Sequence, residues 1–354
     1  MNDVIKCYDS DKHLWVFTGQ GSLKLKNIKH LYGENNTFKF YFSKYISRLE
    51  DILDISLMEM ILEESPELNK RTDLEQPITV ALQLAIAKMW NEVNFYPSVV
   101  IGHSIGEYSA AVIAGIMNTS DALLLAAHRG NLMSKSPEGG MAAVFKGIKE
   151  LLPLPNDIVV AAKNAPNLTV ISGPYQQLEN FLNINHSDNH VMLNVGYAFH
   201  SPSMREAASN FENYVKKINL KYPKESVKFI STLTGNEETE KLTSINYWVE
   251  QIVQPVNYLK AVNTCMEIFP NVSSVSELGV SSTLLNITKK ILTNTEKVKY
   301  IPFDSSIKVF KSEKKIFDSK PIPWNKPKIV KKSQENILNK YTFETNWELT
   351  STEK

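Results

Sequence analysis

The stretch VVIGHSIGEYSAAVIAG, residues 99–115, constrains the fold of this chain more than any other. An apolar run typical of a buried strand leads into Gly102-His103-Ser104-Ile105-Gly106, and small residues at helical spacing follow. This order predicts a strand, a very tight turn and a helix. The turn leaves no room for side chains two residues before or after the serine, which accounts for both glycines. The serine hydroxyl is therefore expected to be exposed at a helix N-terminus.

Such a turn suits a nucleophile, because the backbone N–H of Ile105 can hold a developing oxyanion. A serine hydroxyl also needs a base, normally a histidine. Of the seven histidines, His200 ends an apolar run in GYAFHSPSM, whereas His103 should point away from the neighbouring Ser104. On these residues alone, an ordinary strand-to-helix turn and a structural histidine remain the alternatives.

Composition excludes several classes of protein. The chain has 354 residues, 43% of them hydrophobic, and a formal charge of +1, so it can bury a large core but offers no basic surface for nucleic acid. No segment approaches the roughly 20 apolar residues that span a bilayer, and MNDVIKCYDSDKHLW lacks the apolar core of a signal peptide. Cys7 and Cys265 are too few for a disulfide framework or a metal cluster. We expect a cytoplasmic protein with no metal, nucleic-acid or membrane partner.

The order of elements predicts an α/β fold with a mainly parallel sheet. Short apolar runs alternate with helical patterns, including helices expected over 76–93 and 245–267. Strand-like runs cluster at 138–202, which predicts a small α+β insert in a catalytic domain formed by 1–137 and 203–304. Residues 305–354 are rich in lysine and punctuated by proline, as in a linker-like tail.

Several motifs, taken in order, resemble one family. They are FTGQGS (17–22), IGHSIGEYSAAVIAG (101–115), HRGNLM (128–133), GGMAAVF (139–145), NAPNLTVISG (164–173), GYAFHSPSM (196–204) and QPVNY (254–258). Together they are similar to the malonyl-CoA:acyl carrier protein acyltransferases, including the acyltransferase domains of polyketide synthases. The resemblance implies an α/β-hydrolase-like large domain with a ferredoxin-like insert.

The resemblance also implies the catalytic groups. Ser104 would be the nucleophile and His200 the base, and the N–H groups of Gln20 and Ile105 would form the oxyanion hole. The main-chain carbonyl of Gln251 would orient the imidazole in place of a triad carboxylate. No cofactor would be bound by the enzyme itself, since coenzyme A and the acyl carrier protein bring their own phosphopantetheine.

Substrate selection is implied in the same way. Arg129 corresponds to the arginine that pairs with the free carboxylate of a malonyl group, a task suited to the guanidinium fork, and Gln76 is expected among the substrate-binding residues. Tyr197 and Phe199 lie in the YAFH selectivity signature. Phe199 resembles the malonyl-type form, whereas Tyr197 resembles the methylmalonyl-type form, so malonyl is favoured over substituted malonyl units.

The function expected is transfer of a malonyl-type unit from a thioester donor to an acyl carrier protein in polyketide or hybrid polyketide-peptide biosynthesis, by a free-standing enzyme that supplies a synthase. A carrier protein rather than coenzyme A as donor, a housekeeping fatty-acid transacylase, a proofreading serine hydrolase and a non-catalytic docking protein remain alternatives. Nine lysines within 308–332 either steer the acidic carrier protein or belong to a structural strap.

Overall fold

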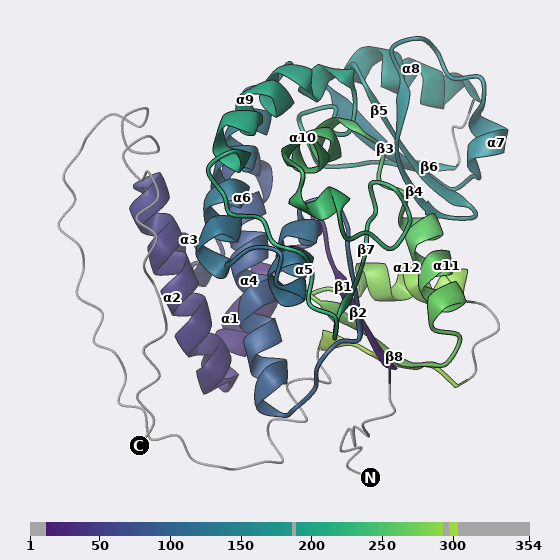
Figure 1. Cartoon of the computed structure of the whole chain (residues 1–354). Coiled ribbons are helices and arrows are strands. Elements are labelled where there is room, and N and C mark those ends of the chain that lie inside the picture. The colour runs from purple at the N-terminus through teal and green to yellow at the C-terminus, as the bar shows by residue number, and fades with distance from the viewer. Residues whose placement is uncertain (1–11, 186–188, 293–296, 304–354) are drawn as a thin grey trace, which may run out of the picture.

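A parallel sheet forms the centre of the computed structural model, which describes residues 12–185, 189–292 and 297–303 (Figure 1). Within these residues the sheet has five strands in the order β7-β2-β1-β8-β9, and every neighbouring pair is parallel. The strands are β1 (Lys12–Phe17), β2 (Val99–Gly102), β7 (Lys228–Ile230), β8 (Val272–Leu278) and β9 (Lys299–Ile301). All their carboxyl ends therefore meet at one edge, where α/β folds place their sites.

Helices cover both faces of this sheet, as the sequence pattern predicts. Helices α4 and α5 contact one face, with α6 and α1–α3 outside them, whereas α11 and α12 contact the other (Figure 1). Helix α9 packs between α6 and α10. The bounds are α1 (Leu25–Glu34), α2 (Asn36–Leu53), α3 (Leu57–Leu62), α4 (Thr72–Glu92), α5 (Gly106–Ala114), α6 (Thr119–Met133), α9 (Arg205–Val215), α10 (Ile245–Val253), α11 (Tyr258–Ile268) and α12 (Thr283–Ile291), with short 3₁₀ turns η1 (Leu68–Lys70), η2 (Pro202–Met204) and η3 (Lys241–Thr243).

The core lies between the sheet and these helices. Strand β1 is the middle strand, and Leu14 to Phe17 are all fully buried, as expected for a strand covered on both faces. Trp15 packs against Phe95, which also contacts Trp90 of α4. Burying aromatic side chains of this size stabilises the fold by roughly 2–3 kcal/mol each.

A second, antiparallel sheet lies beside the first, with strand order β4-β5-β3-β6. It comprises β3 (Gly140–Val144), β4 (Val159–Ala165), β5 (Leu168–Gly173) and β6 (His190–Met192), with α7 (Ile148–Leu151) and α8 (Tyr175–Asn185). Leu178 and Leu182 of α8 pack on one face of it in a small core of their own. Strand β4 also bonds to the main body, because the N–H of Lys163 donates to the carbonyl of Val256 and the N–H of Val256 donates to Ala161.

These two sheets confirm the predicted fold class, although two helix boundaries were wrong. Helix α4 begins at Thr72, so Pro77 lies inside it rather than in its first turn, and the missing N–H leaves the carbonyl of Asp73 without its helical partner. The helix expected over 245–267 is two helices, because Gln254 is extended and Pro255 follows it. The domain boundaries proposed from sequence stay a prediction, and the tail at 305–354 lies outside the described residues.

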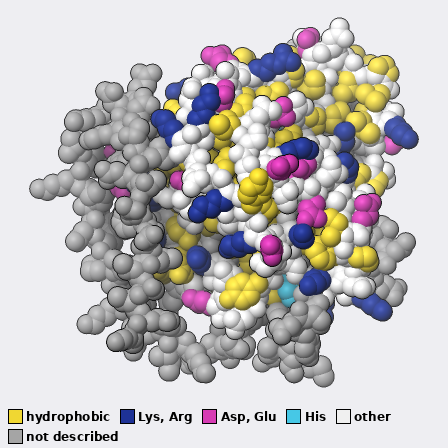
Figure 2. All heavy atoms as spheres, in the orientation of Figure 1, with side chains coloured by type: hydrophobic (Ala, Val, Ile, Leu, Met, Phe, Trp, Pro, Cys, Tyr) yellow, Lys and Arg dark blue, Asp and Glu magenta, His cyan; other side chains and the backbone are white. Residues whose placement is uncertain are grey.

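The surface carries charges of both signs. On the face shown in Figure 2, Lys and Arg side chains are interspersed with Asp and Glu, as the formal charge of +1 suggests. Among the helices that the structure describes, none is long and apolar enough to cross a membrane.

Candidate active site

Ser104 occupies the tight turn between β2 and α5. Its φ of 52° lies in the left-handed region, which costs a non-glycine residue about 1–3 kcal/mol. Both flanking glycines are required: a Cβ on Gly102 would overlap the backbone of Glu107, and one on Gly106 would overlap the carbonyl of Phe17 at the end of β1. The predicted turn is confirmed, and the same close approach brings the end of β1 beside the serine.

His200 faces the serine across the site. Its Nε2 lies 2.8 Å from Ser104 Oγ, and its Nδ1 lies 2.9 Å from the carbonyl of Gln254. A carbonyl can only accept, so Nδ1 carries the proton and Nε2 accepts the serine hydroxyl hydrogen. Burial, with the positive charge of Arg129 next, lowers the pKa of His200 to about 3, so the imidazole is neutral near pH 7. His200 also has a left-handed φ of 55°.

The carbonyl that bonds to His200 partly corrects the sequence expectation. The hydrogen bond runs to Gln254 rather than Gln251, because α10 ends at Val253 and Gln254 follows it in extended conformation. The Gln251 carbonyl also acts to raise the pKa of His200, but its effect is smaller than that of the Gln254 carbonyl. The Gln251 side chain does more: its Nε2 donates to the Ser104 carbonyl at 2.6 Å and its Oε1 accepts from Arg129 at 3.2 Å.

Arg129 projects from α6 and is fully buried. Its guanidinium donates to Gln76 Oε1 at 2.6 Å, to Ser104 Oγ at 3.1 Å and to Gln251 Oε1, all of them uncharged. Among the described residues no carboxylate pairs with it, and its Nε has no hydrogen-bond partner. Burial lowers the pKa of Arg129, but an arginine stays charged in a protein. The site therefore holds a buried cation 3.1 Å from the serine hydroxyl, with no ion-pair partner among the described residues.

Gln20 lies in the turn after β1. Its side chain donates to Thr72 Oγ1 at 3.0 Å and accepts from Gln76 at 3.2 Å. A Cβ on the preceding Gly19 would come within 3.7 Å of the Ser104 Cβ, so this turn directly adjoins the serine. Among the described residues, the backbone N–H groups of Gln20 and Ile105 donate to no protein acceptor.

The two aromatic residues of the YAFH segment lie together. The hydroxyl of Tyr197 donates to the carbonyl of Ser134 at 2.6 Å, and the ring centroids of Tyr197 and Phe199 are 5.8 Å apart. Phe199 is buried, whereas Tyr197 is half-buried. The hydrogen bond of its hydroxyl thus holds Tyr197 in place, and Phe199 directly precedes His200 in the chain.

Sequence reasoning missed two groups around the turn. His103 points away from Ser104, as expected, but its Nε2 bonds to Asn164 Oδ1 of β4 at 2.9 Å and so links the turn to the small sheet. Glu107 is fully buried in the first turn of α5. Glu107 could have been found from the sequence, because it is an acidic residue inside an otherwise apolar helix. The contact of Asn164 depends on tertiary packing, so no sequence signal indicated it.

Comparisons with known proteins identify the family of this chain. Residues 14–304 match the family described as acyl transferase domain. The chain is 31% identical, over 76% of its length, to a "PKS-NRPS hybrid synthetase" of Aspergillus niger, of which the match spans 15%. The acyltransferase domain from the second module of the salinomycin polyketide synthase aligns with a TM-score of 0.76 and 27% identity, over 85% of this chain and 72% of that one.

A structure of a type II polyketide synthase acyl carrier protein in complex with its malonyl-transacylase also aligns, with a TM-score of 0.74 over 86% of this chain and all of that one. Its 23% identity shows the shared fold alone. A serine under backbone strain beside a neutral histidine is an arrangement that can support acyl transfer. This chain belongs to the acyl transferase domain family and is an acyltransferase.

Proposed function

We propose that this acyltransferase moves a malonyl-type unit from a thioester donor, coenzyme A foremost, to the phosphopantetheine thiol of an acyl carrier protein. Ser104 is the nucleophile and His200 the base. The observation that carries the proposal is the fully buried Arg129, which has no carboxylate partner among the described residues and lies 3.1 Å from the nucleophile. A buried charge is costly unless it is paired, and a substrate carboxylate supplies the missing partner.

The first half of the reaction acylates the serine. His200 Nε2 takes the hydroxyl proton while Ser104 Oγ attacks the thioester carbonyl, and the electron pair of that carbonyl moves to oxygen. In this proposal, the backbone N–H groups of Gln20 and Ile105 donate to this oxyanion. When the oxyanion collapses, the C–S bond breaks, and the departing thiolate takes the proton from His200.

The second half runs the same steps in reverse. A phosphopantetheine thiol gives its proton to His200 and attacks the acyl-serine, and Ser104 leaves with the proton returned to it. Both thiols arrive on the substrates, so the chemistry requires no cofactor or metal of the enzyme. The complex named in the structural comparison, a carrier protein with its transacylase, supports an acyl carrier protein as partner.

Arg129 also tunes the base. Its charge helps to lower the pKa of His200, because two positive charges in one buried site repel each other. A malonyl carboxylate on the guanidinium offsets that charge, so the imidazolium formed during attack becomes easier to form. The arginine would thus select the acyl group and, once paired, assist the attack on it. Simple acyl chains offer neither effect, which disfavours the hydrolase alternative.

Substituting Arg129 tests this proposal. Arg129→Ala should lower kcat/KM for malonyl transfer by more than tenfold, about 1.4 kcal/mol or more, while acetyl transfer holds or rises. The measurement is the rate of acyl transfer to a carrier protein from malonyl-CoA and from acetyl-CoA. Arg71→Ala, which removes a partly exposed arginine at the start of α4, serves as the matched control and should leave both rates unchanged. Equal losses for both acyl groups in Arg129→Ala would contradict the proposed role.

A further inference from the structure

Glu107 is a buried acid that the proposed reaction does not use. It follows the serine turn on α5, and its N–H donates to the Ser104 carbonyl at 3.0 Å. Its side chain reaches the loop after β7: Oε1 accepts the N–H of Thr232 at 2.6 Å and lies 2.9 Å from Thr232 Oγ1. Oε2 lies 3.0 Å from the hydroxyl of Tyr247 on α10. The carboxyl thus joins three elements that surround the nucleophile.

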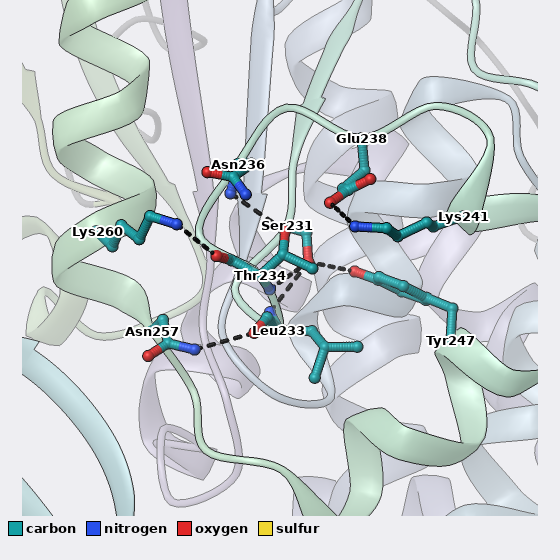
Figure 3. A network of polar contacts seen from close by, with 9 residues as sticks. All are labelled: Ser231, Leu233, Thr234, Asn236, Glu238, Lys241, Tyr247, Asn257 and Lys260. Carbon is teal, nitrogen blue, oxygen red and sulfur yellow. Dashed lines mark hydrogen bonds and ion pairs between the residues drawn. The ribbon is translucent and has the colours of Figure 1, made fainter.

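These contacts form a chain of oxygen atoms. It begins at the Gly102 carbonyl, 2.8 Å from Thr232 Oγ1, passes through both Glu107 oxygens to Tyr247, and ends at Ser231 Oγ, 2.7 Å from the phenol. Figure 3 shows the outer end, where the hydroxyl of Tyr247 points at Ser231. All four side chains are buried, so the protein itself must satisfy their polar atoms.

One hydrogen for each contact along this chain favours an uncharged acid. The four oxygen–oxygen contacts need four hydrogens, and the Gly102 carbonyl supplies none. The three hydroxyls of Thr232, Tyr247 and Ser231 supply one each. Ser231 Oγ already accepts the N–H groups of Leu233 and Thr234, so it is filled as an acceptor and donates to Tyr247. Tyr247 then donates to Oε2 and Thr232 to Gly102, which leaves the contact between Oε1 and Thr232 Oγ1 without a hydrogen.

We propose that Glu107 is held as a neutral carboxylic acid whose Oε1 proton is donated to Thr232 Oγ1, and that this uncharged chain positions the Ser104 turn. The proton completes all four hydrogen bonds. It ties the Gly102 carbonyl, two residues before the nucleophile, to the loop after β7 and to α10. Helix α10 carries Gln251 and leads into Gln254, so one hydrogen-bonded chain sets the spacing between the serine and the supports of His200.

The charge of Glu107 matters because charged and titratable groups lie near its carboxyl group. The charged and titratable groups that face Glu107 are Arg129 of α6, Tyr247 of α10 and Tyr108 of its own helix. Burial outweighs the hydrogen bonds that favour the carboxylate and raises the pKa of Glu107 to about 7. A carboxylate here would partly offset the charge of Arg129 and compete with the substrate carboxylate. The neutral acid supports the turn and leaves that charge for the substrate.

Carbon-13 NMR of protein labelled at the glutamate carboxyl carbons tests this directly, on enzyme without any donor. Wild type at pH 6 should show a carboxylic-acid signal that is missing from Glu107→Gln and that moves to the ionised position near pH 7. In Tyr247→Phe the same signal should titrate at higher pH, because the carboxylate loses a donor. This second variant assigns the signal even if Glu107→Gln does not fold. A Glu107 signal at the ionised position from pH 5 to 9 would overturn the proposal.

The role of Glu107 in positioning the Ser104 turn is tested separately, by an activity assay that rests on the proposed function. The kcat/KM for self-acylation by malonyl-CoA should fall several-fold between pH 6 and 8.5 in wild type and stay level in Glu107→Gln. His200 does not produce this fall, because it is neutral throughout the range. Glu50→Gln is the matched control: burial also raises the pKa of Glu50, which lies on α2 outside α4, and that variant should keep the fall. A fall persisting in Glu107→Gln would refute the role, whereas absence of self-acylation would count against the proposed function and leave the NMR result standing.

Discussion

Two glycine turns meet at the candidate active site, and they are fixed in different ways. In the turn after β2, Gly102 and Gly106 press against neighbouring backbone, so close packing restricts the conformation of Ser104. In the turn after β1, Gly21 has a φ of 88° and open space where its Cβ would be. A hydrogen bond holds this second turn: the N–H of Gly21 donates to Glu75 Oε1 of α4 at 2.7 Å.

The difference follows from the two tasks that we propose. A nucleophile must sit within hydrogen-bond reach of its base, and close packing of backbone on backbone gives that accuracy. An oxyanion donor such as Gln20 must also admit a substrate, and its turn is held by hydrogen bonds to side chains of α4 rather than by close packing at Gly21. Small changes in the first turn should therefore be far more damaging than the same changes in the second.

The largest effect is expected from Gly106→Ala. Its methyl group would overlap the Phe17 carbonyl, which cannot move without shifting the middle strand, so the free energy of unfolding should fall by about 3 kcal/mol and self-acylation should be lost. Gly21→Ala is the matched control. It meets no atom and bears only the strain of a positive φ, roughly 1–2 kcal/mol. Urea unfolding of both variants measures the difference, and equal losses would remove the distinction between the turns.

A smaller effect on the free energy of unfolding is expected from Glu75→Gln. At pH 5 the glutamic acid and the glutamine amide are both neutral, and both accept the Gly21 N–H. Burial raises the pKa of Glu75 from 4.5 to about 7, so the folded state keeps a proton that the unfolded chain has lost. That contribution is complete below pH 4.5 and disappears as pH rises through 7. Wild type should therefore lose stability relative to Glu75→Gln from pH 4.5 to 7, as urea unfolding at several pH values would show. A relative gain with rising pH would contradict the assignment.

The Ser104 turn could be predicted from the residues alone, whereas the expected roles of His200 and Arg129 came from the resemblance of several motifs to the family. The spacing Gly102-x-Ser104-x-Gly106 encodes a turn that requires glycine, and strand–helix alternation encodes the parallel sheet. The features that the sequence did not predict depend on packing between distant segments. Helix α4 starts at Thr72 because α6 packs on its first turn, where a Cβ on Gly130 would press on the Thr72 carbonyl.

The partner of His200 shows the same limit. Which carbonyl meets the imidazole depends on where α10 ends, and element boundaries are the least certain part of any sequence-based prediction. Because α10 ends at Val253, His200 Nδ1 hydrogen-bonds to the carbonyl of Gln254, and the Gln251 carbonyl contributes a smaller effect. Likewise, Asn164 of β4 acquires its contact with His103 only when the small sheet docks on the large one.

The mass of the intact protein after incubation with malonyl-CoA tests the central claim, an acyl-serine at residue 104, most directly. Wild type should gain one malonyl mass, Ser104→Ala should gain none, and His200→Ala should gain it roughly 10²–10⁴-fold more slowly, as expected for a lost general base. Running acetyl-CoA and a malonyl-carrier protein in parallel identifies the donor. Acylation that persists in Ser104→Ala at the wild-type rate would contradict the account, because the acyl group would then reside on another residue.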